Sequence, residues 1–167
     1  MKKLISIFLL LTFLIGCSNQ SNENLFIATS ISTSKFSKNN DYYIVSDLEY
    51  LGEKSAIIEK IEIVKADEVI DEYILIDEFN YSFFIGDKYS RIGVHKNLER
   101  IGGDVIPAEN SIINKDNMLK LILKINTKSS ITKSNNRYIR IKYIIDKETR
   151  EEVLDSKTVN QLETALD

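Results

Sequence analysis

The stretch YIRIKYII, residues 138–145, decides the fold class because its apolar side chains recur at every second position. Four of them would share one side of an extended chain: Ile139, Ile141, Tyr143 and Ile145. The opposite side would carry Arg140 and Lys142. Successive side chains of a β-strand point to opposite faces, so the pattern predicts an antiparallel-type strand with one buried and one wetter face.

The same alternation recurs in residues 42–50 and 119–125, which we predict to be two further strands of this kind. Four more strands are expected, at residues 26–31, 56–65, 72–77 and 105–113. The alternation breaks near Glu59 and Lys60, where a β-bulge would restore it. Composition agrees, because the chain holds 26 Ile and only five Ala, and β-branched side chains favour strands over helices.

Length and composition limit how these strands can be arranged. The chain has 167 residues, 43% of them hydrophobic and 28% charged, which fits one globular domain at residues 25–167. About seven short strands in that length predict an all-β fold, an antiparallel β-sandwich. A small barrel or an α+β fold is the alternative. Residues 155–167 would form a short C-terminal helix with a capping box at Thr158 and Gln161, or else a last strand.

Residues 80–104 differ from their surroundings, since they hold four of the six glycines, and we expect a long excursion with one or two short strands. They also hold a dense group of aromatic side chains, and we predict that four of these bind a partner: Tyr81, Phe83, Phe84 and Tyr89. Aromatic side chains are enriched at interfaces because they bury much surface at a modest entropy cost. The alternative is that they fill the end of the sandwich as part of its core.

The first sixteen residues have the layout of a secretory signal. Lys2 and Lys3 precede an apolar run of 12 residues, 4–15. A helix of that length rises only about 18 Å, whereas the hydrocarbon core of a bilayer is about 30 Å thick, so a stable membrane span is not expected. The run ends in Leu14-Ile15-Gly16-Cys17, directly before a polar stretch.

This ending resembles the lipobox of bacterial lipoproteins. The resemblance implies that a dedicated peptidase recognises Leu14, Ile15 and Gly16 and leaves Cys17 as the first residue of the mature chain, with a diacylglycerol on its thiol. Residues 17–24 would then be the lipidated cysteine and a polar tether. The expected location is the extracytoplasmic side of a bacterial cell membrane, with the membrane itself as a partner through the lipid.

Two parts of the domain resemble the immunoglobulin-like domains of small bacterial lipoproteins. The first is residues 42–61, where a strand, a turn containing Gly52 and a second Ile-rich strand follow one another. The second is residues 106–110 followed by 119–121. The resemblance implies an immunoglobulin-like sandwich, although the Cys…Trp…Cys framework of antibody domains is absent because the chain has no Trp.

The sequence offers little for catalysis. Its one histidine, His95, belongs to no identifiable nucleophile–base pattern, and we assign it no chemistry. One His and one lipidated Cys are too few for a usual zinc site and no calcium-loop pattern occurs, so no metal or other cofactor is expected. The formal net charge of −3 argues against nucleic acid as a partner.

These observations favour a non-enzymatic binding module at the bacterial cell envelope, whose partner is an envelope protein or a peptide. Two alternatives stay open. One is an immunity-type lipoprotein that sequesters an antimicrobial peptide. The other is a hydrolase of envelope material, which the lack of a convergent acid–base group disfavours.

Replacing Cys17 by Ser tests the lipoprotein hypothesis, because the lipid is expected on the thiol. The Cys17→Ser protein should remain an uncut precursor and should take up no labelled fatty acid when cells are fed that label. Ser21→Ala, in the tether, is the control and should be cut and labelled like the original protein. Labelling of Cys17→Ser at the original level would overturn the hypothesis.

Overall fold

The computed structural model describes residues 24–67 and 71–165. The predicted signal peptide, the predicted lipobox and the predicted tether up to residue 23 lie outside the described residues, so what the sequence suggests for them remains a prediction.

Eleven strands and two short helices make up the regular structure of the described residues. The strands are β1 (Phe26–Ala28), β2 (Asp41–Tyr50), β3 (Ala56–Asp67), β4 (Glu72–Leu75), β5 (Tyr81–Gly86), β6 (Gly93–His95), β7 (Val105–Pro107), β8 (Ile112–Ile113), β9 (Leu119–Asn126), β10 (Arg137–Ile145) and β11 (Glu148–Asp155). The helices are η2 (Leu98–Arg100), a 3-10 turn, and α2 (Lys157–Asn160).

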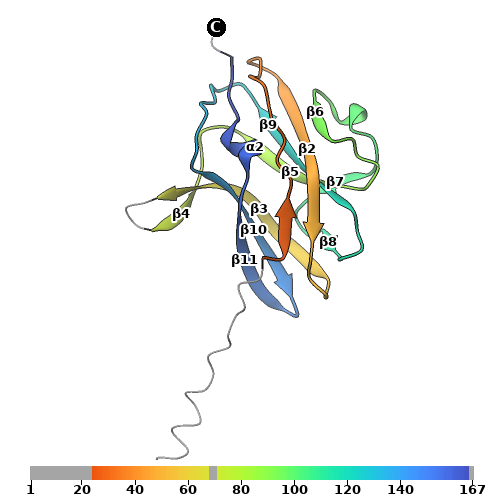
Figure 1. Cartoon of the computed structure of the whole chain (residues 1–167). Helices are drawn as coiled ribbons and strands as arrows, with labels where there is room; N and C mark the ends of the chain where they lie inside the picture. The colour runs from red at the N-terminus through yellow and green to blue at the C-terminus, as the bar shows by residue number, and fades with distance from the viewer. Residues whose placement is uncertain (1–23, 68–70, 166–167) are drawn as a thin grey trace, which may run out of the picture.

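These strands form two antiparallel sheets that pack face to face (Figure 1). The first sheet has the order β1-β2-β9-β5-β7, and β6 also pairs with β2. The second has the order β11-β10-β3-β4, and β8 also pairs with β3. The predicted fold class, an all-β antiparallel sandwich with a short C-terminal helix, is confirmed. The strands outnumber the expected seven because five of them are only two to four residues long.

The main core lies between the sheets and is built from the period-two apolar residues. Four side chains of β10 are buried in it: Ile139, Ile141, Tyr143 and Ile145. Leu121, Leu123 and Ile125 of β9 belong to the same cluster. The three strands predicted from the clearest alternation are therefore confirmed as β2, β9 and β10. β1 and β4 are shorter than predicted.

The predicted bulge in β3 is also confirmed. Lys142 of β10 pairs with Lys60, but the next residue, Tyr143, pairs with Ile58, which leaves Glu59 without a partner of its own. This extra residue keeps both Ile58 and Ile61 in the core although three positions separate them.

Part of the outer face of the first sheet is covered, whereas the alternation predicted a wetter face. Tyr43 and Val45 of β2 and Ile122 of β9 are buried there in a second apolar cluster. Ile101, from the segment between β6 and β7, packs on them and is fully buried. Alternation within a strand could not reveal this cover, because the covering residues come from an irregular segment elsewhere in the sequence.

Residues 80–104 hold two strands, β5 and β6, as expected, but the prediction of one long excursion is wrong. Their first part forms β5, which lies between β9 and β7 inside the first sheet. Only the remainder, residues 87–104, loops out and returns across the outer face. Gly102 and Gly103 in its last turn have φ angles of 71° and 67°, a left-handed conformation that a side chain would strain.

Residues 105–113 form two strands rather than the predicted one. β7 pairs with β5 in the first sheet, and β8 pairs with β3 in the second. The chain crosses between the sheets where the N–H of Ala108 donates to the carbonyl of Phe83 (3.1 Å) and that of Asn110 donates to the carbonyl of Ile58 (2.8 Å). An apolar alternation looks the same whether a strand stays in one sheet or changes sheets, so the sequence did not show this crossing.

Of the two alternatives predicted for residues 155–167, the described residues form the helix and not a last strand, whereas the strand at residues 148–155 had not been predicted. β11 precedes α2, which is only four residues long. Ser156 is the N-cap of α2, so the predicted capping box at Thr158 is wrong. The Thr158 hydroxyl is buried instead and accepts a hydrogen bond from the N–H of Ile31 (2.8 Å).

Arg137 joins separate segments of the chain through a buried guanidinium, 1% exposed. It donates to the carboxylate of Glu78 (2.5 Å) and to the carbonyls of Thr132 (2.7 Å) and Val159 (3.3 Å). It also lies over the ring of Phe79, 5.3 Å from the centroid. A buried charge persists only where it is paired and hydrogen-bonded. Arg137 therefore ties β10 to the β4–β5 connection and to the C-terminal segment.

Truncating Ile141, which is completely buried, should destabilise the domain by about 2–5 kcal/mol because it leaves a cavity between the sheets. Ile112→Ala is the matched control, since that side chain is 62% exposed, and its cost should stay within about 0.5 kcal/mol. Chemical denaturation measures both values. Equal costs for the two variants would contradict the assignment of the core.

Candidate functional site

The middle of β3 lacks a neighbouring strand on one side. β8 pairs with Ala56 and Ile57 at one end of β3, and β4 pairs with residues 64–67 at the other. Among residues 24–67 and 71–165, no strand pairs with Lys60, Ile61 or Glu62 on that side. The second sheet therefore has a notch in its edge.

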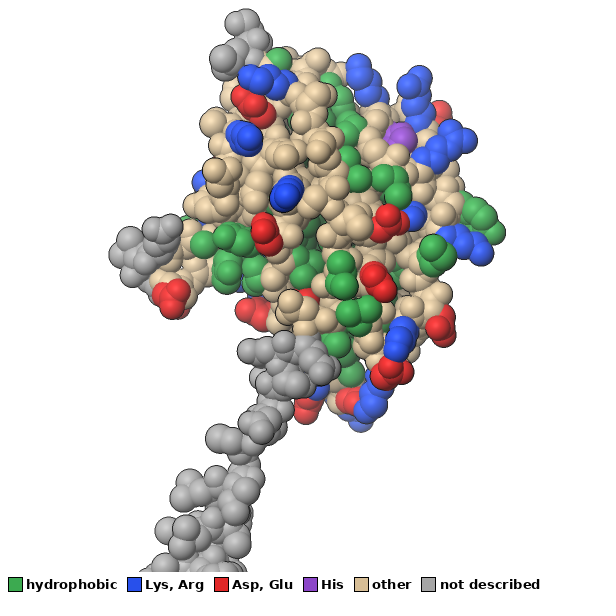
Figure 2. Space-filling model, in the orientation of Figure 1, with side chains coloured by type: hydrophobic (Ala, Val, Ile, Leu, Met, Phe, Trp, Pro, Cys, Tyr) green, Lys and Arg blue, Asp and Glu red, His purple; other side chains and the backbone are tan. Residues whose placement is uncertain are grey.

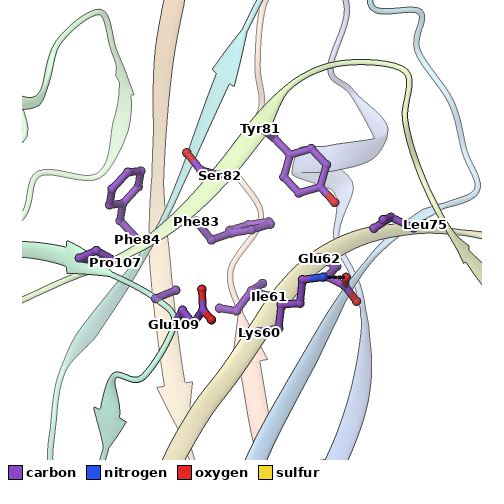
Figure 3. A pocket seen from close by; sticks show the side chains of 11 residues that line it. Lys60, Ile61, Glu62, Leu75, Tyr81, Ser82, Phe83, Phe84, Pro107 and Glu109 are labelled. Carbon is purple, nitrogen blue, oxygen red and sulfur yellow. Dashed lines mark ion pairs between the residues drawn. The ribbon is translucent and has the colours of Figure 1, made fainter.

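A cleft of about 440 Å³ opens at this notch, between β3 of one sheet and β5 of the other (Figure 3). Its volume is within the range of small-ligand sites. The lining residues come from β3, β4, β5, and the segment that begins with β7: Lys60, Ile61, Glu62, Leu75, Tyr81, Ser82, Phe83, Phe84, Pro107, Ala108 and Glu109.

Three of the four aromatic residues predicted to bind a partner line this cleft, and the fourth does not. Figure 3 shows Tyr81 and Phe83 on the side of β5 that faces β3, and Phe84 on the opposite side. Phe83 belongs to the main core and Phe84 packs against the second apolar cluster. Tyr89 is 69% exposed and has Lys88 over its ring. The four side chains therefore do not form one surface.

Tyr81 takes the place of a missing strand partner for β3. Its hydroxyl accepts a hydrogen bond from the N–H of Ile63 (3.0 Å) and donates to the carbonyl of the same residue (3.4 Å). Its ring has edge contacts with Phe79 and Phe83, at centroid distances of 5.9 and 5.8 Å. Burial raises the pKa of Tyr81 above its ordinary value, so the hydroxyl stays protonated and can donate. Tyr81 thus bridges the two sheets at one end of the cleft.

Glu62 carries a buried charge that two cations neutralise. One carboxylate oxygen lies 2.6 Å from Nζ of Lys60, and the other lies 2.8 Å from Nη2 of Arg140. Burial pushes the pKa of Glu62 upward, but hydrogen bonds from Lys60 and Arg140 outweigh it and hold that pKa below its usual range. The Glu62 bond likewise raises the pKa of Lys60. Both groups are therefore charged at neutral pH and engaged with each other.

Glu109 differs from Glu62, because it is exposed and its carboxylate has no ion-pair or hydrogen-bond partner among the described residues. Asp77, two residues after the end of β4, is also exposed, and its carboxylate also has no partner among the described residues. Its neighbour Ile76 donates its N–H to the carbonyl of Ile63 (3.2 Å). The unpaired carboxylate of Glu109 thus lines the cleft, and that of Asp77 lies two residues after the lining residue Leu75 in the chain.

Sequence reasoning had not found the β3, β4 and β7 sides of this cleft. Lys60, Glu62, Leu75 and Glu109 are ordinary strand and turn residues when each is taken alone. The irregular alternation at Glu59 and Lys60 was the one usable signal, since it marks the part of β3 that lies between its two short partners.

The other features that the sequence suggested for chemistry lie away from the cleft. Nε2 of His95 lies 2.8 Å from the carbonyl oxygen of Arg91, and Figure 2 shows His95 at the surface among Lys and Arg side chains. Within the described ranges, no group of three or more His, Cys, Asp or Glu side chains could hold a metal ion. The helices in that part of the chain are all too short or too polar to cross a membrane.

Comparisons with protein-family models and with curated proteins give no match for this sequence. The functional argument therefore depends on the geometry and chemistry of the cleft itself.

Glu62 should make stability depend on pH in the acidic range. Its lowered pKa means that its contribution is present above the ordinary glutamate pKa of about 4.3 and is lost as the pH falls through the folded-state value. Glu62→Gln should be less stable than the original protein at neutral pH and should lose less stability on acidification. Glu59→Gln, on the same strand, is the control and should follow the original curve. Thermal unfolding at a series of pH values measures this, and identical curves for Glu62→Gln and Glu59→Gln would refute it.

Proposed function

We propose that this protein is a non-enzymatic binding module held at the outer face of a bacterial cell membrane by a lipid on Cys17. Its partner, an envelope protein or a peptide, inserts a segment into the cleft between β3 and β5. The observation that carries this proposal is the notch in the edge of β3, which opens into a cleft walled by Tyr81, Phe83 and Leu75. An apolar cleft with a few polar groups is the usual form of a binding site.

The charges in the cleft support binding over catalysis. General acid–base catalysis needs titratable groups that are free to exchange protons with a substrate. Here the Glu62 carboxylate is neutralised by two cations, and the Tyr81 hydroxyl is engaged with the backbone of β3. Glu109 is the one lining carboxylate left without a partner in the described part of the chain.

The attachment of the N-terminal segment suits a domain carried on a tether. The carboxylate of Glu152, on β11, accepts hydrogen bonds from the N–H groups of Leu25 (2.9 Å) and Phe26 (3.2 Å). This holds the chain at the end of the sandwich that also carries the β2–β3 and β10–β11 turns, whereas β4 projects from the side (Figure 1). A tether at that end leaves β4 and its wall of the cleft accessible. We also propose that the domain is immunoglobulin-like, since sandwiches of this kind commonly carry variable binding sites.

A second function, an immunity-type role, is favoured by one observation. The carboxylate of Glu109, in the cleft, and that of Asp77, two residues after Leu75 in the chain, are unpaired among the described residues, and they would attract a cationic antimicrobial peptide. In that case the bound segment would belong to the antimicrobial peptide instead of an envelope protein, and the same cleft would hold it.

Leu75→Asp should abolish capture of the partner from detergent-solubilised membranes, because it places a charge on the apolar wall of the cleft. The side chain is 54% exposed, so the domain should still fold. Ile74→Asp is the matched control, since Ile74 is 46% exposed in the same strand and its side chain points to the opposite face. It should capture the partner at the original level.

Tyr89→Ala distinguishes the cleft from the loop that the sequence suggested as part of the site. If the cleft is the site, Tyr89→Ala retains the partner. Loss of the partner in Tyr89→Ala, with normal capture by Leu75→Asp, would place the site on the loop and refute the proposal.

A further inference from the structure

We infer that the segment bound in the cleft is an extended peptide that adds a short strand to β3 between β8 and β4 and places a basic side chain near Glu109. This inference rests on the proposed function, because it specifies the ligand of the same cleft. The hydrogen-bonding directions of β3, the length of the notch and the charges around it all favour such a ligand.

The backbone of β3 directs one set of hydrogen-bonding groups into the notch. Ile63 turns its N–H and carbonyl toward this side, since they bond to the Tyr81 hydroxyl and to the N–H of Ile76. Residues two apart in a strand direct these groups to the same side. The N–H and carbonyl of Ile61 therefore point into the cleft, where no strand of the described residues pairs with them.

The two strands that flank the notch set the direction of the added strand. β8 and β4 both run antiparallel to β3 on this side, so they resemble two pieces of one interrupted strand. The gap extends from Ile58, which bonds to Asn110 and Ser111, to Ile63, and measures about 15 Å at the usual strand rise. A stretch of three or four extended residues fits that length. Strand addition of this kind is a common mode of peptide recognition.

The sides of the cleft determine which side chains the added strand would carry. Inward-pointing residues would meet Tyr81 and Phe83, so apolar side chains suit these positions (Figure 3). Glu62 is bonded to both Lys60 and Arg140, which leaves Glu109 as the one charged side chain of the lining without a bonded partner among the described residues. Asp77, two residues after Leu75 in the chain, is a second exposed carboxylate without a partner among the described residues. A lysine or arginine side chain is the complement of these charges.

The short length of the notch also explains why this edge need not cause aggregation. A long open strand edge pairs with other edges, whereas β8 and β4 cover both ends of β3 and leave only a few residues free. A second copy of the chain would have to fit one of its own strands into the same short gap. A short peptide segment fits the gap better, and self-association is one of the outcomes that the following experiment distinguishes.

The test uses the full chain in detergent, labelled with a heavy nitrogen isotope at isoleucine, and a positional library of acetylated and amidated tetrapeptides as the probe. Pools with lysine or arginine at one position should shift the amide signal of Ile61 and slow its hydrogen exchange. The same pools with N-methylated backbones should bind at least about tenfold more weakly, because they cannot complete the backbone hydrogen bonds. Glu109→Gln should weaken binding of the basic pools by roughly fivefold, while Glu99→Gln, an exposed control, should not.

Each remaining outcome overturns a specific part of the inference. If no pool affects Ile61 while Leu75→Asp still abolishes partner capture, strand addition is wrong and the cleft remains the site. If Leu75→Asp has no effect on capture, the proposed function is wrong, and the inference about its ligand is wrong with it. A preference for acidic pools refutes the charge argument. A response of Ile61 to protein concentration without any peptide would show that a second copy of the chain fills the notch.

Discussion

The burial of one apolar face from each sheet is the interaction on which the rest of this structure depends. The side chains of Ile139 and Ile141 lie in one core with Leu121 and Leu123 from the opposite sheet. The domain has no internal disulfide, because its only cysteine is Cys17, so this core must supply most of its stability. Face-to-face packing also brings β3 and β5 opposite each other, although they belong to different sheets. The cleft is therefore a direct consequence of how the core closes.

Strand pairing is incomplete along one edge of β3, and polar side chains bond to part of the backbone that the strands leave unpaired. β8 and β4 are too short to meet, so on the side of β3 opposite β10 part of its backbone has no strand partner among the described residues. Tyr81 satisfies one such residue, Ile63, with its hydroxyl. Arg137 has a comparable role elsewhere, since it connects Glu78 and several carbonyl groups within the protein interior. Buried polar groups of this kind specify one arrangement of segments, because any other arrangement would leave them unsatisfied.

The aromatic residues show how far prediction could go. The density of Tyr81, Phe83, Phe84 and Tyr89 drew attention to a segment that contributes to the cleft, since three of them line it. Their spacing could not show that Phe83 and Phe84 point to opposite faces of a central strand, because the segment had not been recognised as β5. Leu75 and Glu109 were missed for another reason. They approach the aromatic residues only because β4 and the crossing after β7 meet the same edge of β3, and such contacts follow from sheet topology instead of local pattern.

The sequence by itself determined the fold class, the longest strands and the bulge at Glu59 and Lys60, because period-two alternation is a local property that burial on one face imposes directly. A local motif also led to the hypothesis of a lipid attachment at Cys17, which stays a prediction. Only the tertiary structure decided which strands are neighbours, where the chain crosses between sheets, and that residues 87–104 cover a second face. It also decided that β3 has an open stretch at Ile61. These features depend on contacts between residues far apart in the chain. The free energy of each such contact depends on the packing of the whole domain, so no single segment predicts it.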